Sequence, residues 1–129
     1  MIKINNKKVI NAPISIGEIF DKITILEIKK EKLKNEKLIN VNLELKLLKK
    51  IVNDNGLNVD RKLINNLREV NNKLWNIEDK IRKKEKLKAF DNEFIEIARS
   101  VYIENDKRSE IKREINIKCN SELVEEKSY

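Results

Sequence analysis

The stretch Leu63-Ile-Asn-Asn-Leu-Arg-Glu-Val-Asn-Asn-Lys-Leu-Trp-Asn-Ile-Glu-Asp-Lys-Ile81 contains the most regular hydrophobic pattern of the chain. Its large aliphatic positions follow intervals of four and three residues: Leu63, Leu67, Val70, Leu74, Ile77 and Ile81. This spacing predicts a helix with a single apolar seam that packs against another helix at a shallow angle, as in a coiled coil. The partner helix could belong to the same chain or to a second subunit.

The composition predicts that the rest of the chain is helical as well. The 129 residues include two glycines and one proline, while 40% of the residues are charged and 40% are hydrophobic. Few turn formers and many helix formers favour long helices over a sheet, and this length fits one domain. We expect an all-α fold, an antiparallel bundle of about four helices in which the last two form a long hairpin.

Capping residues predict where the first two helices begin. Ser15 and Glu18 form a capping box just after the proline, which predicts a first helix that runs to about Leu38. Asn40 is the expected N-cap of a second helix, Val41–Val52.

The later helices are predicted in the same way. The sequence Asn-Asp-Asn-Gly at 53–56 indicates a loop, after which Asp60 caps the third helix. Asp91 caps a fourth helix that runs to about Lys118. The expected organisation is a short extended N-terminal arm (1–13), a helical bundle domain (14–118) and a C-terminal tail (119–129).

The chain has no histidine, and this absence excludes several kinds of site. Ser-His and Cys-His nucleophilic pairs and histidine metal sites cannot form. The lone Cys119 cannot form an intrachain disulfide, which fits a reducing compartment. No stretch approaches 18 consecutive apolar residues, and the N-terminus lacks the apolar core of a signal peptide. We therefore expect a cytoplasmic protein with no membrane association and no cofactor.

The net charge of +7 would suit an anionic partner. Lysine, however, is the common surface residue throughout this chain, and the basic clusters are interleaved with Glu and Asp. A charge excess of this kind is typical of a solvated surface, so nucleic-acid binding is not expected.

The predicted fourth helix carries polar residues on its apolar line, within the stretch Phe94–Asn116. These are Asn105, Arg108 and Lys112, and Glu27 lies within the apolar arc of the first helix. Because an unpaired buried charge costs several kcal/mol, an Arg108–Glu27 ion pair is the expected solution. Such an internal polar network, which would fix how the helices align, is the favoured interpretation.

A ligand site is the alternative interpretation of the same residues. Arg99, Arg108 and Lys112 could form a cationic cluster for a carboxylate or phosphate, because Arg suits bidentate anion binding. Lys22 could join this cluster from the first helix, and Glu27 could orient the cations or act as an acid or base. No catalytic residue can be assigned.

Two pairs of acids have a spacing of three that could hold a magnesium ion: Glu18 with Asp21, and Glu93 with Glu96. On a helical wheel both pairs fall mostly opposite the apolar lines of their helices. We therefore expect them to face solvent or to cap a helix, and we predict no metal site.

Four motifs in order resemble a bacterial family that is catalogued as a domain of unknown function. They are Pro13-Ile-Ser-Ile-Gly-Glu-Ile-Phe-Asp-Lys-Ile-Thr-Ile-Leu-Glu-Ile-Lys29, Leu74-Trp-Asn-Ile-Glu-Asp-Lys-Ile-Arg82, Phe94–Asn116 and the ending Glu125-Glu-Lys-Ser-Tyr129. The resemblance spans the chain from Pro13 onward and implies no established activity.

The sequence favours a helical interaction or accessory module that self-associates as a homodimer, because of its heptad seam and its large apolar arcs. A protein partner of another kind would fit the same features. The alternative is a binder of, or enzyme for, a small anionic molecule such as a phosphate or a sugar nucleotide, and whether the protein is an enzyme stays open.

Overall fold

The computed structural model describes residues 7–128 of the chain. In this part of the chain there are four helices and no strand, which confirms the all-α antiparallel bundle. The helices are α1 (Ile16–Lys32), α2 (Asn35–Asp54), α3 (Arg61–Lys86) and α4 (Asn92–Lys118). Residues 7–15 contain neither helix nor strand, and the part of the predicted N-terminal arm at 1–6 lies outside the described residues.

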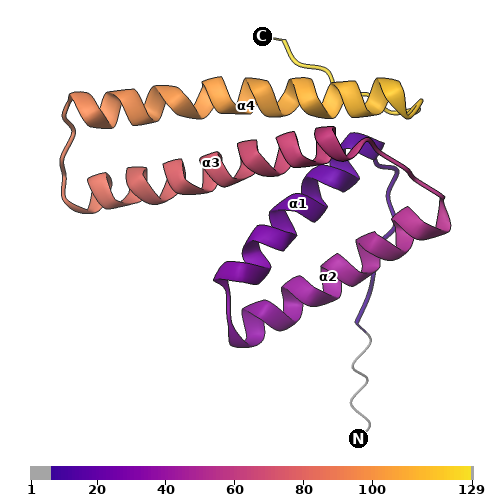
Figure 1. Ribbon diagram of the computed structural model, residues 1–129. Coiled ribbons are helices and arrows are strands. Elements are labelled where there is room, and N and C mark those ends of the chain that lie inside the picture. Colours follow the sequence, from indigo (N-terminus) through magenta and orange to yellow (C-terminus); the bar gives the residue numbers. More distant parts are fainter. Residues whose placement is uncertain (1–6, 129) are drawn as a thin grey trace, which may run out of the picture.

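The helices are arranged as a long hairpin with a shorter helix pair attached near one end (Figure 1). Helices α3 and α4 run antiparallel and form the hairpin, α1 leaves its end, and α2 returns along α1. Helix α1 contacts the other three helices, whereas α2 contacts α1 alone among the four. Over the described residues, none of the helices combines the length and the apolar character needed to cross a bilayer.

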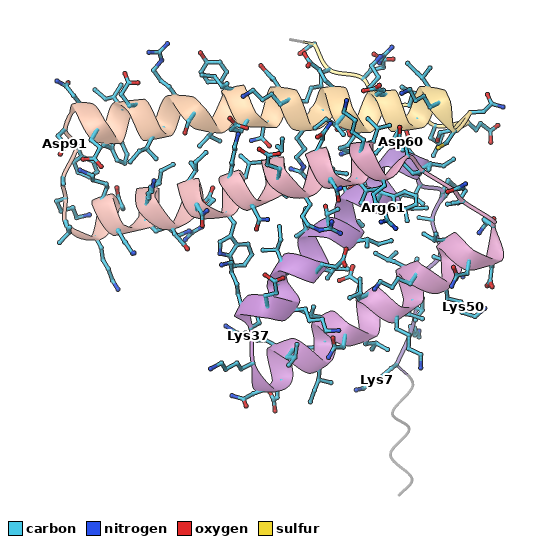
Figure 2. All side chains as sticks on the ribbon, viewed as in Figure 1. Lys7, Lys37, Lys50, Asp60, Arg61 and Asp91 are labelled. Carbon is cyan, nitrogen blue, oxygen red and sulfur yellow. The ribbon has the colours of Figure 1, made fainter. Side chains whose placement is uncertain are left out.

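Three of the predicted N-caps are confirmed. The Ser15 hydroxyl accepts a hydrogen bond from the Glu18 amide at 3.1 Å, and Asp60 and Asp91 accept from the amides of Lys62 and Phe94 at 3.0 and 2.9 Å. Asp60 and Asp91 mark the start of α3 and the turn at the far end of the hairpin in Figure 2. Each cap supplies a partner to an amide that has none within its own helix.

The predicted boundary between the first two helices was wrong. Helix α1 ends at Lys32 rather than near Leu38, and α2 begins at Asn35 rather than after an Asn40 cap. Leu33 is extended, and Asn35 has a φ of 60°, in the left-handed region that Asn adopts more readily than most residues. The chain therefore turns within three residues, Leu33-Lys34-Asn35, without glycine or proline.

The core consists of two clusters on either side of α1. One lies between α1 and α2, and its buried members are Ile19, Ile23, Leu26, Val41 and Leu45. The other joins the start of α3 to the end of α4 through Leu63, Leu67 and Ile115, with Ile16 and Phe20 of α1 packed against it. Because α1 contributes to both, it connects the helix pair to the hairpin.

The heptad seam of α3 finds its partner within the chain, because α3 packs along α4. Only the first half of the seam is deeply buried: the buried residues of α3 end at Asn71, and those of α4 begin at Glu104. Beyond these points the hairpin extends past α1 (Figure 1), and two helices alone leave its apolar residues partly exposed.

Candidate functional site

The candidate site begins where α1 crosses α4 at close range. A Cβ atom at Gly17 would lie 2.5 Å from the backbone oxygen of Lys112, so only glycine permits this approach. The Gly17 amide also donates to Asn116 Oδ1 at 2.6 Å, and Asn116 is buried. A glycine and an asparagine therefore bring the first turn of α1 against the last turns of α4.

One turn along α1, the fully buried Asp21 binds residues from two other helices. Arg108 of α4 donates through Nε to Asp21 Oδ1 at 3.0 Å and through Nη2 to Oδ2, which makes a bidentate pair. Asn71 of α3 donates to Asp21 Oδ1 at 2.9 Å. The Asp21 carboxylate is therefore held at the junction of α1, α3 and α4.

Thr24 completes the buried part of this network. Its hydroxyl donates to the Asp21 backbone oxygen at 2.8 Å and accepts from the Asn71 amide nitrogen at 2.9 Å. Asn71 thus bridges two side chains of α1, and the polar atoms of this junction satisfy one another away from water.

Lys112 forms the second centre of charge. Its ammonium group donates to Glu18 at 2.5 Å and to Glu125 of the C-terminal tail at 3.0 Å, and lies 3.8 Å from Asp21 Oδ2. Burial is the largest single influence and by itself lowers the pKa of Lys112. The hydrogen bonds to Glu18 and Glu125, with the charge of Asp21, outweigh burial and raise that pKa above its ordinary value.

Arg108 connects this network to the surface. The hydrogen bonds to Asp21 are the main reason why the pKa of its guanidinium is raised. Arg108 lines a pocket of about 340 Å³ together with Asn105 and Lys112. It also lines a second pocket of about 380 Å³, formed with Ile25 and Trp75.

The structure brings together only part of the predicted ligand cluster. Asn105 accepts from Arg108 at 3.5 Å, and Arg108 and Lys112 lie one turn apart on α4. Lys22 is exposed on α1, and Arg99 is exposed and lies 3.8 Å from Glu96 on its own helix.

The predicted Arg108–Glu27 ion pair was wrong. Glu27 instead accepts from Arg68 of α3 at 2.9 Å, in a pair whose side chains are about one third exposed. Glu27 lies six residues beyond Asp21 on α1, and Asp21 takes Arg108 because it faces both hairpin helices.

The predicted orientation of Glu18 and Asp21 toward solvent was also wrong. A second line along α1 is buried, with a 4-3-4 spacing of Gly17, Asp21, Thr24 and Ile28. It gives no hydrophobic signal over its first three members, which are small or polar, although its spacing is that of a helix-packing face. Asn71 and Glu125 give no comparable signal in the sequence. Glu93 and Glu96 are exposed, and across residues 7–128 no group of three or more acids or cysteines is placed to hold a metal ion.

The charges at this junction balance one another. Arg108 and Lys112 face Asp21 and Glu18, so two cations meet two carboxylates within the bundle. This arrangement fixes the relative positions of three helices. Arg108 and Lys112 also line the pocket of about 340 Å³.

The chain belongs to DUF6165, a family of unknown function whose model matches residues 4–129. No curated protein and no solved structure matches the chain. The matched region includes both the bundle and the C-terminal tail.

Proposed function

We propose that the protein is a cytoplasmic helical module that self-associates as a homodimer through the outer face of α2. The observation that supports this proposal is a row of exposed aliphatic residues on that face, Ile39, Leu43, Leu47 and Ile51. Ile39 and Leu43 are 67% and 58% exposed, although they lie inside a helix. The opposite face of α2 packs on α1. A helix that is apolar on two opposite faces is typically covered on both.

The spacing of this row suits a second copy of the same helix. Each residue follows the last by four positions, which is the ridge that interdigitates in the commonest class of helix packing, at a crossing angle of about −50°. The row is symmetric about its midpoint between Leu43 and Leu47. A twofold axis there would place Leu43 of one protomer against Leu47 of the other, which makes the face self-complementary.

The surroundings of the row favour a weak dimer. Helix α2 forms the outer edge of the molecule, and the labelled Lys37 and Lys50 lie toward its two ends (Figure 2). Lys30, Lys46, Lys49 and Lys50 line the surface next to Leu43 and Leu47. Two such surfaces repel each other, and a single helix crossing buries less than the roughly 1,600 Å² of a standard interface. We expect a dissociation constant of about 10 to 100 μM, lowered by added salt because salt screens the lysines.

Sedimentation velocity over protein concentrations from about 1 μM to about 1 mM tests this proposal. The wild-type protein should pass from monomer to dimer, and Leu43→Lys should remain a monomer, because it places a charge in the middle of the row. Since Leu43 is exposed, this variant should keep the helical circular dichroism spectrum and thermal midpoint of the wild type.

The matched control is Ile95→Lys, the same kind of change at an exposed residue of α4 in the extended part of the hairpin. It should leave dimer formation unchanged. A monomer at every concentration contradicts self-association, and a dimer lost with Ile95→Lys but kept with Leu43→Lys moves the interface to the hairpin.

A further inference from the structure

The C-terminal tail, residues 119–128, folds back along α4. After α4 the Ser121 amide donates to the Asn116 backbone oxygen at 2.8 Å, which reverses the chain. The Ser121 hydroxyl accepts from the Ile16 amide at 3.1 Å and so ties the tail to the start of α1. The tail then returns over α4, as the yellow end of the chain in Figure 1 shows. Its side chains are therefore presented to the outer face of α4.

Charged residues of the tail pair with α4 in sequence. Glu125 accepts from Lys112 at 3.0 Å, and Glu126 accepts from Arg113 at 3.2 Å. These two neighbouring pairs differ in depth. The Lys112 side chain is 10% exposed, whereas Arg113 is 50% exposed. Only Glu125 therefore brings a carboxylate to a deeply placed cation.

Glu125 forms one edge of the pocket of about 340 Å³ on α4. Its lining includes groups that can bind the polar part of a small molecule: Tyr102, Asn105, Arg108, Ser109 and Lys112. The Glu125 side chain is 56% exposed, so its carboxylate reaches Lys112 from the solvent side.

The charge balance distinguishes Glu125 from the other acids around Lys112. Glu18 and Asp21, both on α1, already neutralise Lys112 and Arg108. Glu125 is an additional carboxylate whose side chain is 56% exposed, so water can solvate it when it leaves Lys112. An ammonium group has three donors, so Lys112 can hold one outer carboxylate besides its inner partners.

We propose that this pocket binds a small molecule with a single carboxylate, which replaces Glu125 on the Lys112 ammonium group. Glu125 is then a built-in competitor that occupies Lys112 at one edge of the pocket when no ligand is present. A monocarboxylate brings to Lys112 the same single negative charge that is lost when Glu125 leaves. A phosphate dianion would bring one negative charge more than the displaced Glu125 carried, and Asp106, which also lines the pocket, already pairs with Lys127 at 4.0 Å. This site does not depend on dimer formation through α2.

The test compares Glu125→Gln with Glu126→Gln, which makes the same change of charge at the next residue of the tail. The probes are glycolate and inorganic phosphate, each compared with sodium chloride at equal ionic strength. Binding is followed through the amide signals of residues 102–112 in NMR titrations. Glycolate should bind Glu125→Gln at least about fivefold more tightly than the wild type, which corresponds to about 1 kcal/mol for the competing Glu125–Lys112 pair. Glu126→Gln should match the wild type.

Three results would overturn the proposal. The first is a glycolate affinity that changes equally in Glu125→Gln and Glu126→Gln, or that changes in neither. The second is phosphate binding as tight as glycolate binding, which would indicate a general anion pocket. The third is unchanged glycolate binding when Lys112→Met is added to Glu125→Gln. Because Glu125 is largely exposed, Glu125→Gln is expected to fold, so the first comparison decides the matter even if Lys112→Met does not fold.

Discussion

Asp21 is the residue on which the meeting of three helices depends. A carboxylate removed from water is costly unless its oxygens are paired, and here the partners come from α3 and α4. Alternative alignments of α1 on the hairpin would separate Asp21 from Arg108 or from Asn71. We infer that this polar junction selects one alignment among several that would bury similar apolar area.

Asp21→Asn should destabilise the protein by about 2 to 3 kcal/mol, because it leaves the Arg108 guanidinium without its counter-charge. The value lies below the roughly 3 to 5 kcal/mol of a fully buried broken pair, since the Arg108 side chain is 28% exposed and water can partly solvate it. Urea unfolding followed by circular dichroism measures this loss.

Glu27→Gln is the matched comparison, because Glu27 also pairs with an arginine across helices. Its side chain and that of Arg68 are 34% and 37% exposed, so the loss should stay below about 1 kcal/mol. Equal losses of unfolding free energy for the two variants would show that burial does not make the Asp21–Arg108 pair stronger than the Glu27–Arg68 pair.

At the scale of the helices, the turn between α1 and α2 determines which face of α2 is covered. Leu33 breaks the helix in an extended conformation and Asn35 restarts it with a φ of 60°. Inserting or deleting one residue in this turn would rotate α2 by about 100° about its own axis, since a helix has 3.6 residues per turn. A different face of α2 would then pack on α1.

Asn35→Gly should leave the stability nearly unchanged, whereas Asn35→Val should cost about 1 to 2 kcal/mol. Glycine adopts a positive φ freely, and a β-branched residue does not. Differential scanning calorimetry of the two variants tests this, and a harmless valine would mean that the turn can rearrange.

The sequence predicted the helices where their ends carry a side-chain signal. Ser15, Asp60 and Asp91 each accept from the amide that their position in the sequence indicated. The turn at 33–35 has no such signal, because Lys34, the N-cap of α2, makes no side-chain capping bond. The boundary therefore depends on tertiary packing, which local propensity does not report.

Of the ion pairs in the candidate site, the sequence predicted the cations but not their acidic partners. Arg108 and Lys112 stand out because charges interrupt an apolar line, and both belong to the junction. Their shared partner Asp21 was missed, since it lies on a line of α1 that contains few apolar residues. A helix that packs on two sides has two buried faces, and the hydrophobic pattern identifies only the more apolar of them.

At the scale of the whole molecule, Lys112 ties α1, α4 and the tail together and should make stability depend on pH. Its pKa is raised in the folded state by Glu18 and Glu125 in spite of burial. The stabilising contribution is therefore fully present below the unfolded pKa of about 10.4 and is lost as the pH rises through the folded pKa.

The difference in unfolding free energy between the wild type and Lys112→Met isolates this effect. It should be constant from about pH 7 to about pH 9 and should shrink above about pH 10. Contributions of other groups, such as Cys119, whose pKa burial raises, cancel in this difference. A difference that grows with pH in that range would contradict the assignment.

Because α2 contacts only α1 among the helices, we expect it to open more readily than the rest of the bundle. Helix α2 can open while α1 stays on the hairpin, at a free energy below that of global unfolding. Such a partially opened state would expose both apolar faces of α2 at once and could exchange α2 with a neighbouring molecule. The attachment that leaves α2 free to bind a second copy is thus also the most direct route to domain swapping.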